Sequence, residues 1–194
     1  MPSRSPRTLP MVNVPQLVPS QTCLTCEVCC RFPERNSPLR PYFRMQEIDR
    51  AIAHGLAPIH FSDHQGCHIT VIPHPHAEGY ICPAFDPLTQ HCQIYEVRPL
   101  DCQLYPFLLM WDPDRTTVLL GWDRKCPFLL QTSPHTVHPL SSSELAVYAH
   151  HLSTTLDGPE TAAQLAQTPK LITCYQDDVV IVAELKRLTH HLVH

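Results

Sequence analysis

Cysteine is the residue type in this sequence whose number and spacing could do chemistry. Ten cysteines occur in 194 residues, and Cys23, Cys26, Cys29 and Cys30 lie close together. A spacing of two intervening residues lets a tight turn direct two or three thiolates at one metal ion, with zinc–sulfur distances of about 2.3 Å. Adjacent residues of an extended chain point to opposite sides, so Cys29 and Cys30 do not readily bind one ion. The pair therefore either divides between two centres or leaves one thiol spare.

Four further cysteines follow at wider spacing: Cys82, Cys92, Cys102 and Cys126. Two of them, Cys82 and Cys126, directly precede a proline. This step also occurs where a cysteine ligates an iron–sulfur cluster. Four clustered and four dispersed thiols match two four-thiolate sites, or one cluster and one zinc ion.

Two arginines are placed to balance the charge of such centres. Four thiolates around a divalent ion leave a charge of about −2, which favours nearby cations. Arg31 directly follows Cys30, and Arg98 lies within the second group of cysteines. The sequence therefore predicts that Arg31 and Arg98 contact the ligands of the centre from outside. A structural role for Arg98 and Tyr95, in which the guanidinium binds loop carbonyls, stays open.

The cysteine pattern resembles a known family. The segments CLTCEVCCR at 23–31, CPAFDPLTQHCQIYEVRPLDCQLYPF at 82–107 and CP at 126–127 are similar to the YkgJ-type cysteine-cluster family, which is described as zinc- or iron-chelating. The same pattern occurs in flagellin lysine N-methylases, so the resemblance also implies a setting beside methyl transfer, although this sequence shows no separate methyl-donor domain. The resemblance implies eight metal ligands: Cys23, Cys26, Cys29, Cys30, Cys82, Cys92, Cys102 and Cys126.

Other residues that could bind metal fall outside this pattern. Cys67 and Cys174 are expected to be small buried hydrophobic residues, as free cysteines commonly are. His60, His64 and His68 recur every four residues within a His/Pro-rich segment at 58–79, but Gly66 argues against a helix there. A second metal site on these histidines is less favoured than a structural role.

Composition and charge argue against several classes of protein. The five glycines stand alone, so no glycine-rich phosphate loop can form. The formal net charge is −4 without a basic stripe, which argues against nucleic-acid binding. The apolar runs are too short to span a membrane, and the first 20 residues lack the apolar core of a secretory signal. We therefore expect a cytoplasmic protein, in whose reducing environment clustered thiols bind metal more often than they form disulfides.

The chain divides into three predicted parts. Residues 1–22 are rich in proline and predict a disordered arm. Residues 23–130 predict a cysteine-cluster metal-binding domain. Residues 131–194 predict a C-terminal helical extension packed on that core.

Local patterns predict an α+β fold. Helical periodicity indicates helices at 45–54 and 141–156, the second with a serine cap, and Pro99 can begin a short helix that carries Cys102. Residues 178–194 fit either a helix or a strand followed by a helix. The expected architecture is a small, loop-rich cysteine core with a short antiparallel sheet and flanking helices. Alternating patterns predict two strand pairs: 67–73 with 80–84, and 107–111 with 116–122.

These features favour a metal-binding protein whose thiolates hold zinc or an iron–sulfur cluster. The metal stays undecided because thiolates suit both. One alternative is a redox or methyl-transfer-associated enzyme that uses an iron–sulfur cluster and a thiol such as Cys30. Another is a zinc-stabilised interaction module that docks a protein partner on helices 141–156 and 178–194. The sequence identifies no catalytic residue.

Overall fold

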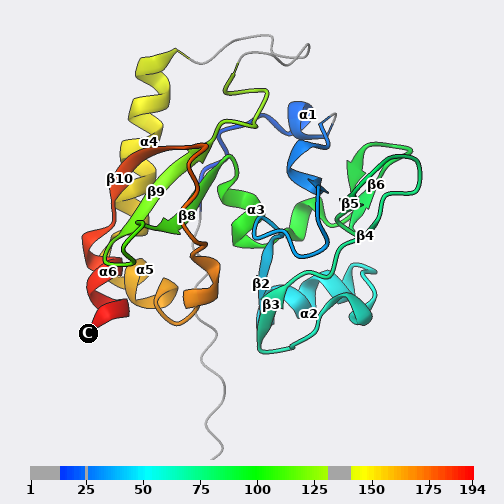
Figure 1. The fold of residues 1–194 in the computed structure, drawn as a ribbon, viewed down its shortest axis with the longest axis horizontal. Coiled ribbons are helices and arrows are strands. Elements are labelled where there is room, and N and C mark those ends of the chain that lie inside the picture. The colour runs from blue at the N-terminus through cyan, green and yellow to red at the C-terminus, as the bar shows by residue number, and fades with distance from the viewer. Residues whose placement is uncertain (1–13, 25, 131–140) are drawn as a thin grey trace, which may run out of the picture.

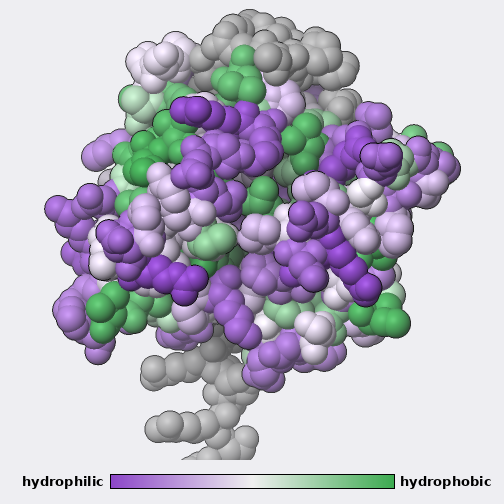
Figure 2. Space-filling view, in the orientation of Figure 1, coloured by the Kyte–Doolittle hydropathy of each residue, from purple (hydrophilic) through white to green (hydrophobic). Residues whose placement is uncertain are grey.

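The computed structural model describes residues 14–24, 26–130 and 141–194 (Figure 1). The expected α+β class is confirmed, with short antiparallel sheets and flanking helices. None of the helices in these ranges is long and apolar enough to cross a membrane. Hydrophilic residues cover most of the face in Figure 2, with smaller apolar patches between them.

A three-stranded antiparallel sheet forms the C-terminal half of the molecule, in the order β10-β9-β8. Strands β8 (Phe107–Trp111) and β9 (Val118–Asp123) form the hairpin predicted from the sequence, with Leu109 opposite Leu120. Strand β10 (Val179–Glu184) pairs with β9. Its run of valine and isoleucine has high β propensity. The last segment is therefore a strand followed by helix α6 (Lys186–Val193).

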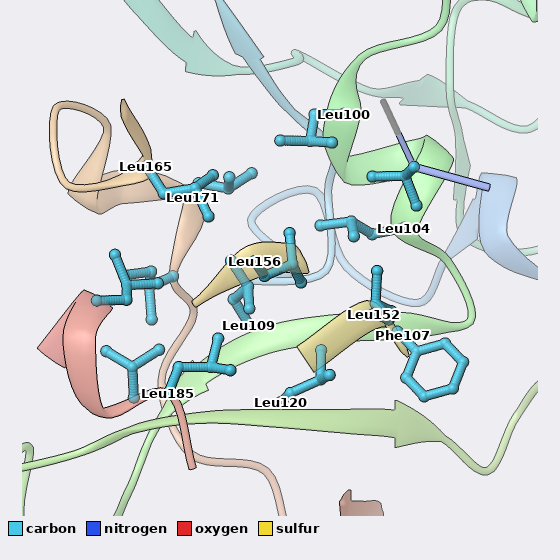
Figure 3. Packing of buried hydrophobic residues seen from close by; sticks show 14 of the residues in the cluster. Leu100, Leu104, Phe107, Leu109, Leu120, Leu152, Leu156, Leu165, Leu171 and Leu185 are labelled. Atoms are coloured by element: carbon cyan, nitrogen blue, oxygen red, sulfur yellow. The ribbon is translucent and has the colours of Figure 1, made fainter. Parts of the chain in front are cut away.

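Three helices share one hydrophobic core with this sheet: α4 (Ser142–Leu156), α5 (Pro159–Leu165) and α6. The predicted serine cap is present, since the Ser141 hydroxyl accepts a hydrogen bond from the Glu144 amide at 3.2 Å. Figure 3 shows the packing of side chains from the strands against side chains from the helices. Its labelled members include Phe107, Leu109, Leu120, Leu152 and Leu156. Residues 141–194 thus supply both a strand and half of the core.

The N-terminal half has its own hydrophobic cluster, around Phe43, Ile48 and Ile69. Helix α2 (Met45–Ala53) confirms the predicted helix and ends before Gly55. The strands here are two or three residues long and antiparallel. They are β1 (Arg31–Phe32), β5 (Tyr80–Ile81) and β4 (Ile72–Pro73) in one sheet, β2 (Tyr42–Arg44) with β3 (Gly66–His68), and β6 (Phe85–Asp86) with β7 (His91–Cys92).

Helix α3 (Leu100–Leu104) connects the two halves. Leu100 and Leu104 are buried in the C-terminal core. The Leu100 amide donates to the carboxylate of Glu47 on α2 at 2.9 Å, and the Tyr42 amide donates to Asp101 at 2.8 Å. These two hydrogen bonds fix α3, and with it Cys102, against the N-terminal half.

Residues 14–22 differ from the disordered arm expected for 1–22. Val14 is buried in the C-terminal core and Val18 in a smaller cluster with Cys126 and Phe128, and the short helix α1 (Ser20–Cys23) follows. The high proline content of residues 1–22 predicted disorder, whereas the apolar side chains of Val14 and Val18 are what hold residues 14–22 against the rest of the protein. The rest of the expected arm, residues 1–13, and the segment 131–140 lie outside the described residues.

Candidate metal centre

Two consecutive turns gather the first four cysteines. Cys23 ends α1, and the Cys26 amide donates to the Cys23 carbonyl at 3.3 Å. A 3₁₀ turn over Val28–Cys30 follows, closed by the Cys30 amide on the Glu27 carbonyl at 2.9 Å. The four thiols are therefore held on a compact loop by backbone hydrogen bonds.

Short strands bring Cys82 and Cys92 to Cys30. The Cys82 amide donates to the Cys30 carbonyl at 2.9 Å, next to the pairing of β1 with β5. The β6–β7 hairpin then places Cys92 opposite Phe85, whose amide donates to the Cys82 carbonyl at 2.9 Å. Cys102, from α3, completes this set. Negative charge on the Cys102 or Cys82 thiol raises the pKa of Cys30, so both thiols lie near it.

Cys126 lies in a cluster against which Cys23, at the beginning of the loop, packs. It follows β9, and its amide donates to the Asp123 carbonyl at 3.2 Å. Its buried side chain belongs to the small cluster of Val18 and Phe128, against which Cys23 and Tyr105 pack. The end of β9 is thereby joined to the beginning of the cysteine loop.

The thiols fall into two groups according to which charges act on which pKa. Group A is Cys23, Cys26 and Cys126, with which we count Cys29 because it lies on the same loop, and group B is Cys30, Cys82, Cys92 and Cys102. Cys29 connects the groups, because it accepts a hydrogen bond from the Cys30 thiol and its charge also acts on group B. All eight predicted ligands are therefore neighbours in one region of the fold.

Burial keeps most of these thiols protonated at neutral pH. It raises the pKa of Cys23 and of Cys82 to about 12, and that of Cys126 to about 11. Cys29 is the exception, because the hydrogen bond from Cys30 lowers its pKa. Buried thiols become thiolates readily only when a cation replaces their protons. A bound metal ion would supply that charge.

The donor set fits zinc or iron by its chemistry, since all ten cysteines carry free thiols. Within the described ranges, no group of three or more His, Cys, Asp or Glu side chains has an arrangement that could hold a metal ion. The thiols of Cys29 and Cys30 bind each other instead. Side-chain rotation, on a backbone that already brings the thiols together, would be needed for ligation.

The family model described as "Putative zinc- or iron-chelating domain", under the name CxxCxxCC, matches residues 22–127. The chain belongs to the CxxCxxCC family. The resemblance predicted from the cysteine motifs is thereby confirmed. The match includes both thiol groups and ends before α4, so the three C-terminal helices and β10 lie outside the matched region. None of the curated proteins or solved structures that were compared matches the chain.

Within the CxxCxxCC domain, Arg98 is the arginine close to the thiols. Its charge lowers the pKa of Cys23 and Cys29 in group A and of Cys92 in group B. Arg31, which was predicted to act similarly, forms an exposed ion pair with Glu27 at 2.8 Å. The sequence placed both arginines near the thiols, and the fold directs only Arg98 between the two groups.

Tyr105 is a residue of the CxxCxxCC domain whose role the sequence did not reveal. Its hydroxyl is buried and has no hydrogen-bond partner among the described residues. The charges of Asp123, Cys29 and Cys126 act on it, and burial raises its pKa far above the usual range. An unpaired buried hydroxyl is unfavourable, and a neighbouring thiolate would be an acceptor for it. This orphaned donor is a second feature that fits a metal–thiolate centre beside it.

The remaining candidates from the sequence have other environments. Cys67 is buried in the N-terminal cluster, as expected, whereas Cys174 is exposed, and the expectation of burial there is wrong. Residues 173–177, which follow the short turn at 169–171 and the buried Ile172, run along the surface beside β8, which leaves the Cys174 side chain at the surface. His68 lies in β3 with its Nδ1 2.7 Å from the Arg40 carbonyl, a structural hydrogen bond.

Proposed function

We propose that the protein binds two metal centres, one through each group of four thiols. The observation that supports this proposal is the grouping, in which Cys126 joins Cys23 and Cys26 while Cys30 joins the three central thiols, with Cys29 next to both groups. The Cys29 and Cys30 thiols share a hydrogen bond in this structure, so one of the two side chains would have to rotate for them to serve different ions. Four thiolates per centre satisfy the coordination preferred by zinc and by iron–sulfur clusters.

Each centre would cross-link segments that are distant in sequence. Group A joins the loop after α1 to the end of β9, and group B joins the same loop to β5, β7 and α3. The strands of the N-terminal half have only two or three residues each and contribute few hydrogen bonds. Metal binding free energy in such a domain is folding free energy. The basic role of the metal is then to stabilise this half of the protein.

The same eight cysteines would bind either zinc or iron. Zinc would give structural cross-links, and an iron–sulfur cluster would add the capacity to transfer single electrons. Arg98 would neutralise part of the charge of both centres, and Tyr105 would donate its hydroxyl to a sulfur of group A. Ten free cysteines stay reduced, without forming disulfides, in a reducing compartment, so we propose a cytoplasmic location.

The test is the metal content of protein purified anaerobically, measured by elemental analysis together with the absorbance spectrum and acid-labile sulfide. Two zinc ions, or iron with sulfide, are expected in the wild type. Cys26→Ser in group A and Cys82→Ser in group B should each remove one centre, and the double variant both. Cys67→Ser and Cys174→Ser are matched controls and should keep the full content.

Two results would contradict the proposal of two centres. If both single variants stay folded by circular dichroism and each loses all metal, one shared centre is present. If neither variant loses metal, the thiols are not the ligands.

A further inference from the structure

A cavity of about 660 Å³ adjoins the thiol groups. Its walls come from the loop over residues 28–41, from α3 and β8, and from the segment 171–178. The last of these segments lies outside the region matched by the CxxCxxCC family. The cavity is therefore made jointly by the family domain and the C-terminal part of this chain.

One thiol of each group faces this cavity, Cys29 from group A and Cys102 from group B. Tyr105, whose hydroxyl lacks a partner, is also in the wall, and the exposed Cys174 lies on the side of the C-terminal segment. The other six thiols of the two groups do not line it. The cavity thus meets the thiol cluster at the junction of its two groups.

The charge of the cavity favours a cation. Five carboxyl side chains line it, but only two arginine or lysine side chains; burial raises the pKa of one of the five, Asp101, to about 7, so this group carries only part of a negative charge at neutral pH. Lys125 is already paired with Asp178 and Asp123, and Arg31 with Glu27. A cleft lined by an excess of one charge concentrates ions of the opposite sign and raises their rate of association. The five carboxyl groups belong to Glu34, Asp101, Asp123, Asp177 and Asp178.

We propose that this cavity is the entrance through which a divalent metal ion reaches both thiol groups. The inference rests on the proposed function, since it concerns how the same sites are filled. The step is a ligand exchange without redox change, in which the ion gives up water and each thiol that binds it releases its proton to solvent. The occupant is a hydrated Zn²⁺ or Fe²⁺ ion and not an assembled cluster, because a cluster would also require sulfide.

The test measures the rate at which metal-free, full-length protein takes up Co²⁺ under anaerobic conditions, by the cobalt–thiolate absorbance after rapid mixing. Cys174→Trp should narrow the cavity with an indole ring and slow the uptake several-fold, with the same final amount of bound metal, since access and not affinity changes. Cys174→Ser keeps the space and should load at the wild-type rate. Ile59→Trp, at a highly exposed position away from the cavity, is the control for an added indole ring.

A double variant tests the charge independently. Glu34→Gln combined with Asp177→Asn removes two exposed carboxylates, and should lower the rate about threefold and weaken its dependence on ionic strength. Uptake by Cys174→Trp and by the charge variant at the wild-type rate would overturn this inference alone. A wild-type protein that binds no Co²⁺ would overturn the proposed function instead, so the two failures are distinguishable.

Discussion

The guanidinium of Arg98 lies 4.0 Å from the centre of the Tyr95 ring. The same guanidinium donates to the Gln16 side chain at 3.2 Å, and Gln16 donates to the Tyr95 hydroxyl at 2.8 Å. Stacking and hydrogen bonding together fix the plane of the guanidinium. A cation is thereby held at the junction of the two thiol groups by residues from the N-terminal segment and the central motif.

Arg98→Gln should therefore weaken metal binding. Loss of a residue that supports metal ligands from outside typically lowers affinity about 10- to 100-fold. Arg98→Lys keeps the charge but loses the planar stacking, and should have a smaller effect. The measurement is competition for zinc with a chromophoric chelator. Arg31→Gln is the matched control, since Arg31 pairs with Glu27, and an equal loss of affinity in that variant would show that Arg98 has no special position.

Tyr105→Phe should have opposite effects on the metal-free and the metal-loaded protein. Without metal, the buried hydroxyl lacks a partner, so its removal should raise the free energy of unfolding by about 1 kcal/mol. With metal, the variant should bind zinc more weakly, because a hydrogen bond to a thiolate is lost. Urea unfolding and chelator competition measure the two quantities. If the variant is stabilised without metal and also binds zinc as tightly as the wild type or more tightly, the hydroxyl does not interact with the centre.

Glu47→Ala should destabilise the contact between α2 and α3. The buried carboxylate accepts hydrogen bonds from the amides of Arg44 and Leu100, and from the Arg44 side chain. Its removal leaves buried donors and the guanidinium unpaired, at a cost of about 3 kcal/mol. The free energy of unfolding by urea is the measurement. Glu144→Ala, which removes an exposed carboxylate from the cap of α4, should cost about 1 kcal/mol or less, and equal losses would contradict the prediction.

The stability of the metal-free protein should fall as the pH is lowered below 6.5, in part because of His68. Burial lowers the pKa of this ring from its usual 6.5, so the unfolded chain takes up the proton at a higher pH than the folded chain does. The cost grows from the unfolded pKa downward and levels off below the folded pKa. His68→Gln should flatten this dependence in urea unfolding between about pH 7.5 and 5. The exposed His64→Gln should leave the slope unchanged, and an unaltered slope in His68→Gln would refute the assignment.

Local sequence signals determined the elements that depend on neighbouring residues. The helix at Met45–Ala53 is an amphipathic run that ends before Gly55, and the cap at Ser141 is a contact between residues three apart in sequence. The hairpin of β8 and β9 follows from alternation on both sides of a turn. The cysteine motif that predicts metal ligands is likewise readable from spacing, since cysteines with two residues between them share a turn.

Tertiary structure decided what depends on contacts between distant residues. Composition could not show that Val14 packs in the core, that Gln16 contacts Arg98, or that β10 pairs with β9. The grouping of Cys23 with Cys126, and of Cys30 with Cys102, has the same origin. A cysteine's type and spacing indicate that it can bind metal. Which thiols are neighbours depends on where the strands and α3 are packed, and that is set by burial of apolar surface over the whole chain.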